Sequence, residues 1–418
     1  MSPGRARGRA RAASPPRHGP ALPRFPKFRD VPDEDWRDWR WQLRHRLDWR
    51  AHDVRAFFPR LPAAAVQEFG AYAASYKVAV TPYVLSLVEL DGDGNPKAGD
   101  PIWNQFRFLS PEECASAEGG QARPENWELP GELPTRILHH KYPDRAILRV
   151  VNQCFGHCNY CYLTARVLDR EGSPARAGNA DDWKRSLAYL RAHPEIRDVL
   201  LSGGDPLTLD NARLGKILRE LRAIPSVRTI RLNTRALTFN PFRFDPELVA
   251  LFRTHALTAL EIHVVHPREL TAELDGALRL LDHGGHRPLV LWRAPLLAGI
   301  NDRRETLQAL LAGLYERRIT PYYLFHFAPH ALGRSARGVT VAEGAALLAS
   351  LRRHVPGPAF PRYALFHVGG KHDIPLDGGG SADFRYEQDE QGRPVVRFYN
   401  WRREWVTYPD VVPAPRRP

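Results

Sequence analysis

The sequence predicts an α/β protein whose central part is a partial (β/α)6 barrel, with a helical N-terminal region and a small C-terminal α+β extension. Between residues 139 and 350, apolar strand-like runs alternate with amphipathic helices, which indicates a parallel sheet. The runs are almost continuously apolar, as strands are when both faces of a sheet are covered. Six such units can be counted, which fits a partial barrel better than a closed barrel of about eight.

Four parts are expected along the 418 residues: a disordered basic tail (1–30), a helical region (31–138), the barrel (139–350) and a C-terminal extension (351–418). Up to about Pro26 the tail is mostly Arg, Pro, Ala and Gly, and it offers little apolar surface to bury. The helical region begins with DEDWRDWRWQLRHRL, which has helical spacing, many Trp side chains and an acidic start suited to a helix N-terminus.

The barrel strands and helices follow one another in a regular order. The six predicted strands are AILRVVNQ (146–153), DVLLSGG (198–204), TIRLNTRA (229–236), ALEIHVVH (259–266), LVLWRAPL (289–296) and PYYLFHFA (321–328). Helices such as DDWKRSLAYLRAH (181–193), NARLGKILRELRA (211–223) and DRRETLQALLAGLYERR (302–318) lie between them. Beyond residue 351 the probable strands are PRYALFHVGG (361–370), RPVVRFYNW (393–401) and EWVTYPD (404–410), in an extension that can close over the barrel.

Composition sets limits on the class of protein. The formal charge of +13 comes from 60 Lys and Arg against 47 Asp and Glu, but part of it lies in the tail and the rest is spread thinly. Nucleic acid is therefore not the expected partner, although a nucleic-acid-binding protein with a structural metal stays as an alternative from another class. No run reaches the ~18 apolar residues of a membrane helix, and no secretory signal is recognisable, so a cytoplasmic protein without membrane contact is expected.

Three of the four cysteines follow the first barrel strand in NQCFGHCNYCY, as Cys154, Cys158 and Cys161. Chemistry gathers at the C-terminal ends of barrel strands, and this spacing lets three thiolates wrap one [4Fe-4S] cluster. Three ligands leave one iron open for a substrate or cofactor, which favours catalysis over electron storage. A structural zinc site would need His157 or Cys114 as a fourth ligand, and Cys114 lies in the N-terminal region.

A second motif, SGGDPL, follows the second strand. Taken alone it fits a tight strand-to-helix turn, because glycine is permissive there and aspartate often starts a helix. The order CxxxCxxC, then SGGDPL, resembles the radical S-adenosylmethionine (radical SAM) superfamily. The resemblance implies that the open iron binds S-adenosylmethionine, and that a second segment touching this cofactor consists of Ser202, Gly203, Gly204 and Asp205.

The resemblance narrows to the lysine 2,3-aminomutase family through KYPDRAILRVVNQC, LLSGGDPL, RLNTRAL, HPRELT, AGIND and PYYLFHF, with DWRWQLRHRL near the start. It covers most of residues 34–400. It implies cleavage of S-adenosylmethionine to a 5'-deoxyadenosyl radical, with electrons from a reductant such as flavodoxin or ferredoxin. It also implies an amino-acid substrate and pyridoxal 5'-phosphate held by a lysine as a Schiff base.

The lysine implied by the resemblance is Lys371 in HVGGKHDIPL. Only lysine suits this role, because an arginine guanidinium cannot form the reactive imine. The alternative is an ordinary exposed loop lysine. The family's cations for the pyridoxal phosphate group correspond to Lys141, Arg145 and Arg235, each of which could instead be a surface charge or a salt-bridge partner.

The substrate contacts of the lysine-specific members are not kept. Two acids that hold the substrate's side-chain amine fall on Ala328 and Ala364, and the arginine for its carboxylate falls on Leu163, with Arg166 nearby. A pocket without acids rejects a buried cationic side chain, so an acidic or neutral amino acid is expected in place of free lysine. Candidates for lining the pocket, which could also be structural residues, are His263, His266, Arg293, His326 and His330.

The sequence thus predicts an isomerase, a radical SAM and pyridoxal phosphate-dependent 2,3-aminomutase that moves an amino group from C2 to C3 of an amino acid. One alternative within the family is a different radical reaction on an amino acid or peptide; another lacks pyridoxal phosphate. Past Cys161 the chain has no cysteine, so the zinc that joins subunits in this family is not predicted. A homo-oligomer remains open.

Overall fold

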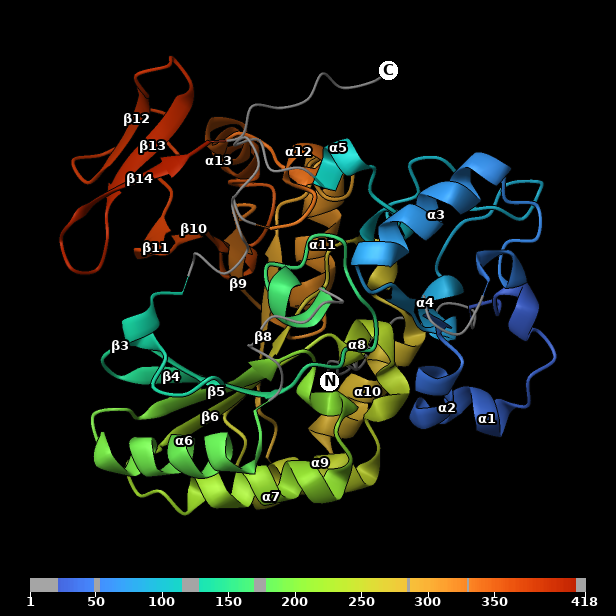
Figure 1. The fold of residues 1–418 in the computed structure, drawn as a ribbon, viewed down its shortest axis with the longest axis horizontal. Coiled ribbons are helices and arrows are strands. Elements are labelled where there is room, and N and C mark those ends of the chain that lie inside the picture. The colour runs from blue at the N-terminus through green and yellow to red at the C-terminus, as the bar shows by residue number, and fades with distance from the viewer. Residues whose placement is uncertain are drawn as a thin grey trace, which may run out of the picture.

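The computed structural model describes residues 22–48, 53–114, 128–168, 178–283, 286–328 and 331–410 (Figure 1). Of the expected disordered tail, residues 1–21 lie outside this part, but residues 22–30 are packed. Phe25 and Phe28 are only 3% and 4% exposed. Their rings lie 5.6 Å from those of Phe58 and Trp41 respectively. The boundary at residue 30 was therefore wrong, because two buried phenylalanines anchor the end of a segment whose composition otherwise favours disorder.

A nine-stranded sheet forms the centre of the molecule, in the order β11-β10-β9-β8-β7-β6-β5-β4-β3. Strands β4 to β10 run parallel, and antiparallel β3 and β11 are the two edges. Their bounds are β3 (Leu138–Tyr142), β4 (Arg145–Val151), β5 (Asp198–Gly203), β6 (Thr229–Thr234), β7 (Ala259–Ile262), β8 (Leu289–Pro295), β9 (Thr320–Phe325), β10 (Arg362–His367) and β11 (Gly370–Asp373).

The six predicted strands are β4 to β9, so the partial barrel is confirmed. The sheet nevertheless continues past residue 350, because β10 adds a seventh parallel strand beside β9 and β11 folds back on it. The helices that alternate with the strands are α6 (Ala180–Ala192), α7 (Asn211–Arg222), α8 (Ala236–Phe239), α9 (Pro246–Thr254), α10 (Ala272–Asp282), α11 (Arg304–Glu316), α12 (Arg334–Arg337) and α13 (Val341–Ser350).

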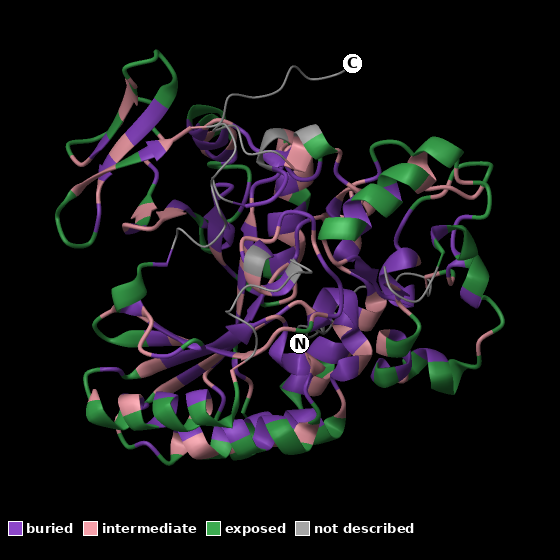
Figure 2. Ribbon diagram, viewed as in Figure 1, coloured by how far each residue is buried: buried purple, intermediate pink, exposed green. Residues whose placement is uncertain are grey.

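These helices cover the outside of the sheet. Figure 2 shows buried strands and helices whose outward faces are exposed. In α7 the buried residues recur at helical spacing, including Leu214, Leu218 and Leu221. Side chains fix where the helices begin: Asn179 and Asp182 form a reciprocal capping box at the start of α6. The apolar stripe then sets each helix against the sheet.

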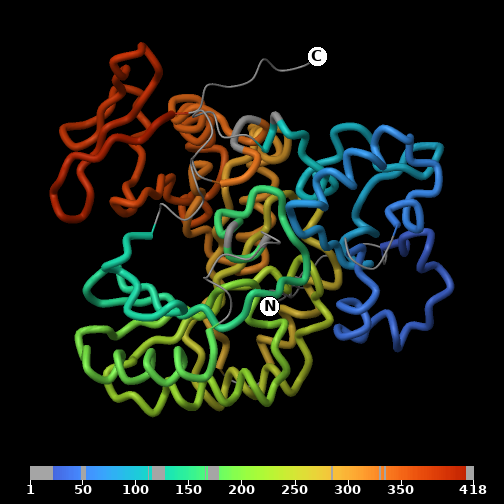
Figure 3. Tube along the Cα trace, viewed as in Figure 1, coloured from blue at the N-terminus to red at the C-terminus, as the bar shows by residue number. Residues whose placement is uncertain are grey.

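The N-terminal region is helical and packs on one side of the barrel (blue in Figures 1 and 3). It holds α1 (Asp33–Arg37), α2 (Trp39–Arg44), α3 (Ala63–Ser75), α4 (Pro82–Leu85), α5 (Pro111–Cys114) and the strand pair β1 (Leu47–Asp48) and β2 (Ala79–Val80). It also hydrogen-bonds to the cysteine loop. The backbone N–H of His157 donates to the Ala79 carbonyl and that of Asn159 donates to the Gln105 carbonyl, both at 2.8 Å. The region therefore supports the candidate site directly.

The C-terminal extension ends in a separate antiparallel sheet on the opposite side of the barrel (red in Figure 3). Its strands are β12 (Phe384–Gln388), β13 (Pro394–Tyr399) and β14 (Trp405–Pro409). β13 and β14 match predicted strands, whereas β12 was not predicted. The buried Tyr408 ties this sheet to the barrel by donating to the Phe327 carbonyl at 2.7 Å.

The two edges of the central sheet come together near Lys371. The hydroxyl of Tyr142, at the end of β3, accepts the backbone N–H of Lys371 on β11 at 2.9 Å. Beside it, Lys141 Nζ donates to the Val368 carbonyl at 2.6 Å. The sheet thus curves into a nearly closed barrel. Within the described residues, no helix has the length and apolar character that crossing a membrane requires.

Candidate active site

A cavity inside the barrel, lined from the first residues of β4 to the loops that follow the strands, brings the two predicted centres of chemistry together. Its lining includes Cys154, Cys158 and Cys161 at one end, and Lys371 and Tyr142 at the other. Residues at or just after the ends of β6, β7 and β8 form the wall between them. The alternation of strand and helix therefore places residues that lie more than 200 positions apart in one site.

The cysteine loop leaves β4 and ends at a short π-helix (Thr164–Leu168). Its shape is fixed from outside: Arg46 donates to the Cys154 carbonyl at 2.9 Å. Gly156 packs so closely that a Cβ there would lie 3.0 Å from the Phe239 ring and 3.2 Å from the Ala79 carbonyl oxygen. The loop is thus held in one conformation before any metal binds.

The cysteine thiols suit an iron–sulfur cluster. Burial, and then the charge of Cys158, raises the pKa of Cys161 to about 12, and burial with the charges of Cys161 and Asp205 raises the pKa of Cys154 well above its ordinary value. Three thiolates in so confined a space need cationic iron beside them. Among the described residues, no three His, Cys, Asp or Glu side chains lie around one position that a single metal ion could occupy. A [4Fe-4S] cluster is larger than one ion and does not need so tight a group of ligands.

The SGGD segment packs against the strand that leads to the cysteines. Gly203 has φ +115°, and a Cβ on it would lie 2.2 Å from the Val151 carbonyl oxygen. A Cβ on Gly204 would lie 2.3 Å from the carbonyl oxygen of Gln153. Both positions therefore require glycine. Gly203 and Gly204 line the cavity, and Ser202 is buried in β5 behind them.

Asp205 joins this segment to the neighbouring strand. Its carboxylate accepts the Thr234 hydroxyl at 2.8 and 2.9 Å and the backbone N–H groups of Arg235 and Leu207 at 2.8 and 3.0 Å. Burial raises the pKa of Asp205 to about 6, although these bonds oppose the rise. Asp205 lines the cavity and also fixes the turn.

Lys371 lies on the edge strand β11 with its side chain exposed to the cavity. Its Nζ stands 5.0 and 5.3 Å from the ring centroids of Tyr323 and Phe325. Desolvation, followed by repulsion from Arg293, lowers the pKa of Lys371 to about 8. A sizeable fraction of the amine is therefore neutral and nucleophilic near neutral pH, unlike that of an ordinary surface lysine.

The three cations predicted for a phosphate group do not lie together. Lys141 and Arg145 line the Lys371 end of the cavity, where Lys141 pairs with Glu132 at 2.7 Å and Arg145 acts on Lys371 by repulsion. Arg235 instead contacts Cys158 at 3.0 Å, and both of its terminal nitrogens are hydrogen-bonded there. The guanidinium of Arg235 is held beside Cys158, and its role at a phosphate group stays a prediction.

A buried ionic group in the middle of the cavity wall was missed. Glu261 on β7 is 1% exposed and pairs with Arg293 at 2.7 Å and with Arg231 on β6. Burial opposes its ionisation, but Arg293 and Arg231 together lower the pKa of Glu261. Asp198 is a second partner of Arg231, at 2.9 Å, so two carboxylates face the two guanidiniums, and Lys371 adds a positive charge nearby when it is protonated. Charged residues inside three predicted apolar strands were the available sequence signal.

A second missed group lies behind Leu163. There Glu128 pairs with Arg166 at 2.5 Å and with Arg149 of β4. Burial and the charge of Arg166 lower the pKa of Arg149 to about 9. Leu163 itself is buried and lines the cavity. Two further arginines therefore stand close to the position from which the family arginine is absent.

The candidate histidines divide into two kinds. His263 lines the cavity, and its Nε2 lies 3.1 Å from Asn233 Oδ1; burial and Arg293 keep its pKa well below the ordinary value. Among the described residues, His266 and His326 do not line the cavity. His266 caps a short helix, and the Nδ1 of His326 lies 2.8 Å from the buried hydroxyl of Tyr363. Their pocket assignment was wrong, because both serve the fold. His330 lies outside the described residues.

The fold and the cysteine site together define a radical SAM enzyme, and residues 148–293 match the Radical SAM superfamily. The chain belongs, within it, to the lysine 2,3-aminomutase family, whose members use a [4Fe-4S] cluster, S-adenosylmethionine and pyridoxal phosphate. L-lysine 2,3-aminomutase of Acetoanaerobium sticklandii is 32% identical over 84% of this chain and 80% of that protein. The enzyme of the same name from Clostridium subterminale is 31% identical over 84% and 81%.

A third relative is named for a different substrate. Glutamate 2,3-aminomutase of Clostridioides difficile is 29% identical over 90% of this chain and 84% of that protein. All three relatives are isomerases that bear the name of an amino acid. Membership of this family makes the chain an enzyme, so the alternative of a nucleic-acid-binding protein with a structural metal is not carried further.

Proposed function

We propose that this enzyme is a pyridoxal phosphate-dependent 2,3-aminomutase that acts on an acidic or neutral α-amino acid and not on free lysine. The observation that carries the proposal is the shared cavity, which is lined by the three cysteines at one end and by Lys371 at the other. A radical formed at the cluster and an amino acid joined to pyridoxal phosphate in place of Lys371 would then share one cavity.

The chain's residues divide the work between two ends of the cavity. At one end, the cysteines would hold the cluster, and Gly203 and Gly204 leave room for S-adenosylmethionine against the backbone. When bound, the cluster with S-adenosylmethionine supplies a radical that abstracts hydrogen, and pyridoxal phosphate supplies an electron sink. At the other end, the low pKa of Lys371 favours bonding of its amine to the pyridoxal aldehyde. The amine of the substrate would then displace the Lys371 amine.

Two cations support a phosphate group beside Lys371. Lys141 and Arg145 line the same end of the cavity. Arg145 is about half exposed, with 49% of its side chain accessible and its Cζ 5.1 Å from the Tyr142 ring. Arg231 also lines the cavity and acts on Lys371.

The charge of the cavity supports an acidic substrate. Glu261 divides its carboxylate between Arg293 and Arg231, whereas Arg231 also pairs with Asp198, so Arg293 is the guanidinium of this wall that is better placed to meet a ligand. Of the two positions expected to hold acids for a lysine side chain, Ala328 lines the cavity and Ala364 is completely buried. An ammonium group would be desolvated here without a partner, whereas a carboxylate would meet Arg293. The glutamate-specific relative is consistent with this choice.

A panel of amino acids tests the proposal. The enzyme is reconstituted anaerobically with iron, sulfide, pyridoxal phosphate and S-adenosylmethionine, reduced by flavodoxin or dithionite, and incubated with glutamate, glutamine, alanine or lysine. We expect a β-amino product, identified by mass spectrometry, from an acidic or neutral amino acid. Lys371→Ala and Cys158→Ala serve as controls that form none. Lysine as the preferred substrate, or product formation by Lys371→Ala, would refute the proposal.

The contribution of Arg293 is tested separately. Replacing it by Gln removes one charged hydrogen bond to the substrate, worth about 1.5–3 kcal/mol, so kcat/KM for an acidic amino acid should fall roughly ten- to hundredfold. The value for a neutral amino acid of similar size should change far less. An equal loss for both substrates would show that Arg293 supports the wall and does not select the substrate.

A further inference from the structure

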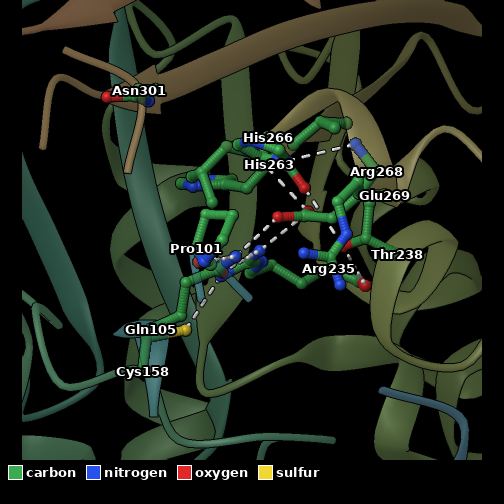
Figure 4. Close-up of polar contacts among 12 residues, drawn as sticks. Pro101, Gln105, Cys158, Arg235, Thr238, His263, His266, Arg268, Glu269 and Asn301 are labelled. Carbon is green, nitrogen blue, oxygen red and sulfur yellow. Dashed lines mark hydrogen bonds and ion pairs between the residues drawn. The ribbon is translucent and has the colours of Figure 1, made fainter. Parts of the chain in front are cut away.

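Arg235 lies beside Cys158, Glu269 and Gln105 of the N-terminal region (Figure 4). Its Nη1 donates to Cys158 Sγ at 3.0 Å and to the Tyr160 hydroxyl at 2.5 Å. Its Nη2 donates to Gln105 Oε1 at 3.0 Å and to Glu269 Oε2 at 3.1 Å. Only 12% of the side chain is exposed, so water screens these contacts poorly.

The guanidinium is fixed in this position by its partners. Gln105 also donates to Glu269 at 2.8 Å, which completes a closed set of contacts around the Arg235 Nη2 atom. The guanidinium carbon lies 3.8 Å from the centroid of the Phe239 ring. The backbone N–H of the same residue donates to Asp205 at 2.8 Å. Arg235 therefore links the S-adenosylmethionine segment and the cluster ligand through one rigid residue.

A cation in contact with a ligand sulfur has a predictable electrostatic effect. Reduction of the cluster from [4Fe-4S]2+ to [4Fe-4S]1+ adds one electron, with no bond formed or broken, and the added negative charge spreads onto the sulfurs. Hydrogen bonds to the sulfurs and nearby net charge are the means by which proteins set this potential. Glu269 offsets part of the positive charge, but Arg235 stands closer to the sulfur because it donates to it directly.

We propose that Arg235 is a positioning residue that orients the Cys158 thiolate and raises the reduction potential of the cluster, so that a cellular reductant can load the electron needed to cleave S-adenosylmethionine. The inference depends on the cluster alone. It holds whichever amino acid is the substrate and whether or not pyridoxal phosphate is bound.

The test measures the potential and not the activity. The whole chain is reconstituted anaerobically with iron and sulfide, without pyridoxal phosphate or amino acid, and titrated with dithionite while electron paramagnetic resonance reports the reduced cluster. In the double variant Arg235→Gln with Glu269→Gln, the neutral pair avoids an unpaired buried charge. At the wild-type midpoint, its ratio of reduced to oxidised cluster should be at least tenfold lower, a shift of 59 mV for one electron.

Two further variants complete the design. Arg235→Lys keeps the charge but loses the forked geometry, and its potential should lie between those of the wild type and the double variant. Arg293→Gln removes a cation of the same cavity that contacts Glu261 and should leave the midpoint unchanged. A wild-type midpoint in the double variant with four irons bound would overturn the proposal. Failure of both Arg235 variants to hold a cluster would also overturn it, because the residue would then serve assembly.

Discussion

The hydroxyl of Tyr142 accepts a hydrogen bond from the backbone N–H of Lys371, and this contact joins the first strand of the barrel sheet to the last. We expect Tyr142→Phe to lower the free energy of unfolding by about 0.5–1.5 kcal/mol, the net worth of one hydrogen bond. It should also reduce the yield of pyridoxal bonded to Lys371, because the edge strand loses its anchor. Urea denaturation and borohydride trapping followed by peptide mass spectrometry measure the two effects.

Tyr189→Phe is the matched control for this change. It removes the hydroxyl that lies 2.9 Å from His140 Nδ1, on the outside of the barrel. A similar stability change with full trapping at Lys371 is expected. Equal trapping losses in both variants would show that a general loss of stability, and not the Tyr142 contact, controls the yield.

The reactivity of Lys371 should depend on pH in a way that an ordinary lysine does not. Its pKa is lowered to about 8, so the protonated amine dominates below that pH and cannot attack an aldehyde. The rate of bonding to pyridoxal phosphate should rise about tenfold per pH unit up to pH ~8 and level off above it. Timed borohydride quenching between pH 6.5 and 9.5 measures this rate. A rise that continues unchanged past pH 9 would contradict the lowered pKa.

Glu261 should be essential to the stability of the cavity wall. Glu261→Gln removes the carboxylate that Arg293 pairs with and leaves Arg231 with Asp198 alone, which should cost about 3–5 kcal/mol of folding free energy. Since the pKa of Glu261 is lowered in the fold, its stabilising effect is present at neutral pH and is lost as the pH falls through that lowered pKa. Denaturant unfolding at pH 7 measures the cost.

Asp198→Asn provides the comparison for Glu261→Gln. Asp198 also pairs with Arg231, at 2.9 Å, but its side chain is 28% exposed. Solvent can replace this partner, so a loss of at most about 1 kcal/mol is expected. If the two variants unfolded alike, the buried position of Glu261 would have no special importance.

The glycines of the SGGD segment should tolerate no side chain. In Gly203→Ala, the new Cβ would lie 2.2 Å from the Val151 carbonyl oxygen, on a backbone with φ +115°. Strain of about 1–3 kcal/mol and a displaced turn are expected, with loss of S-adenosylmethionine binding to the reconstituted enzyme. Equilibrium dialysis measures the binding. Gly131→Ala, where a Cβ meets nothing within 4 Å, should bind as the wild type does.

Features encoded by local spacing could be predicted from the sequence. The positions of the apolar strands, the Cys154–Cys161 loop and the glycine turn follow from residues that are close in sequence. All three contribute residues to the cavity lining. Lys371 was found through resemblance, since spacing alone does not distinguish it from a loop lysine. The seventh parallel strand was assigned to the extension, and its pairing with β9 is visible only in the structure.

Features that depend on pairing between distant strands could not be predicted. Arg235 meets Gln105, which is 130 residues away, and Glu261 meets Arg231 and Arg293 from two neighbouring strands. Sequence position gives no sign of which charges face each other inside a barrel. This is why the contact of Arg235 with Cys158 and the pairing of Glu261 with two arginines appear only in the structure.

The meeting of β3 and β11 also bears on how the enzyme is loaded. Within the described sheet these two strands are not paired by a backbone ladder, and side chains such as Lys141 bridge them. A junction of this kind opens at a lower cost than the parallel strands beside it. We expect pyridoxal phosphate to enter between β3 and β11. Once it is bonded to Lys371, it would hold both edge strands together. We expect proteases to cut the empty enzyme near residues 368–373 and to spare the loaded one.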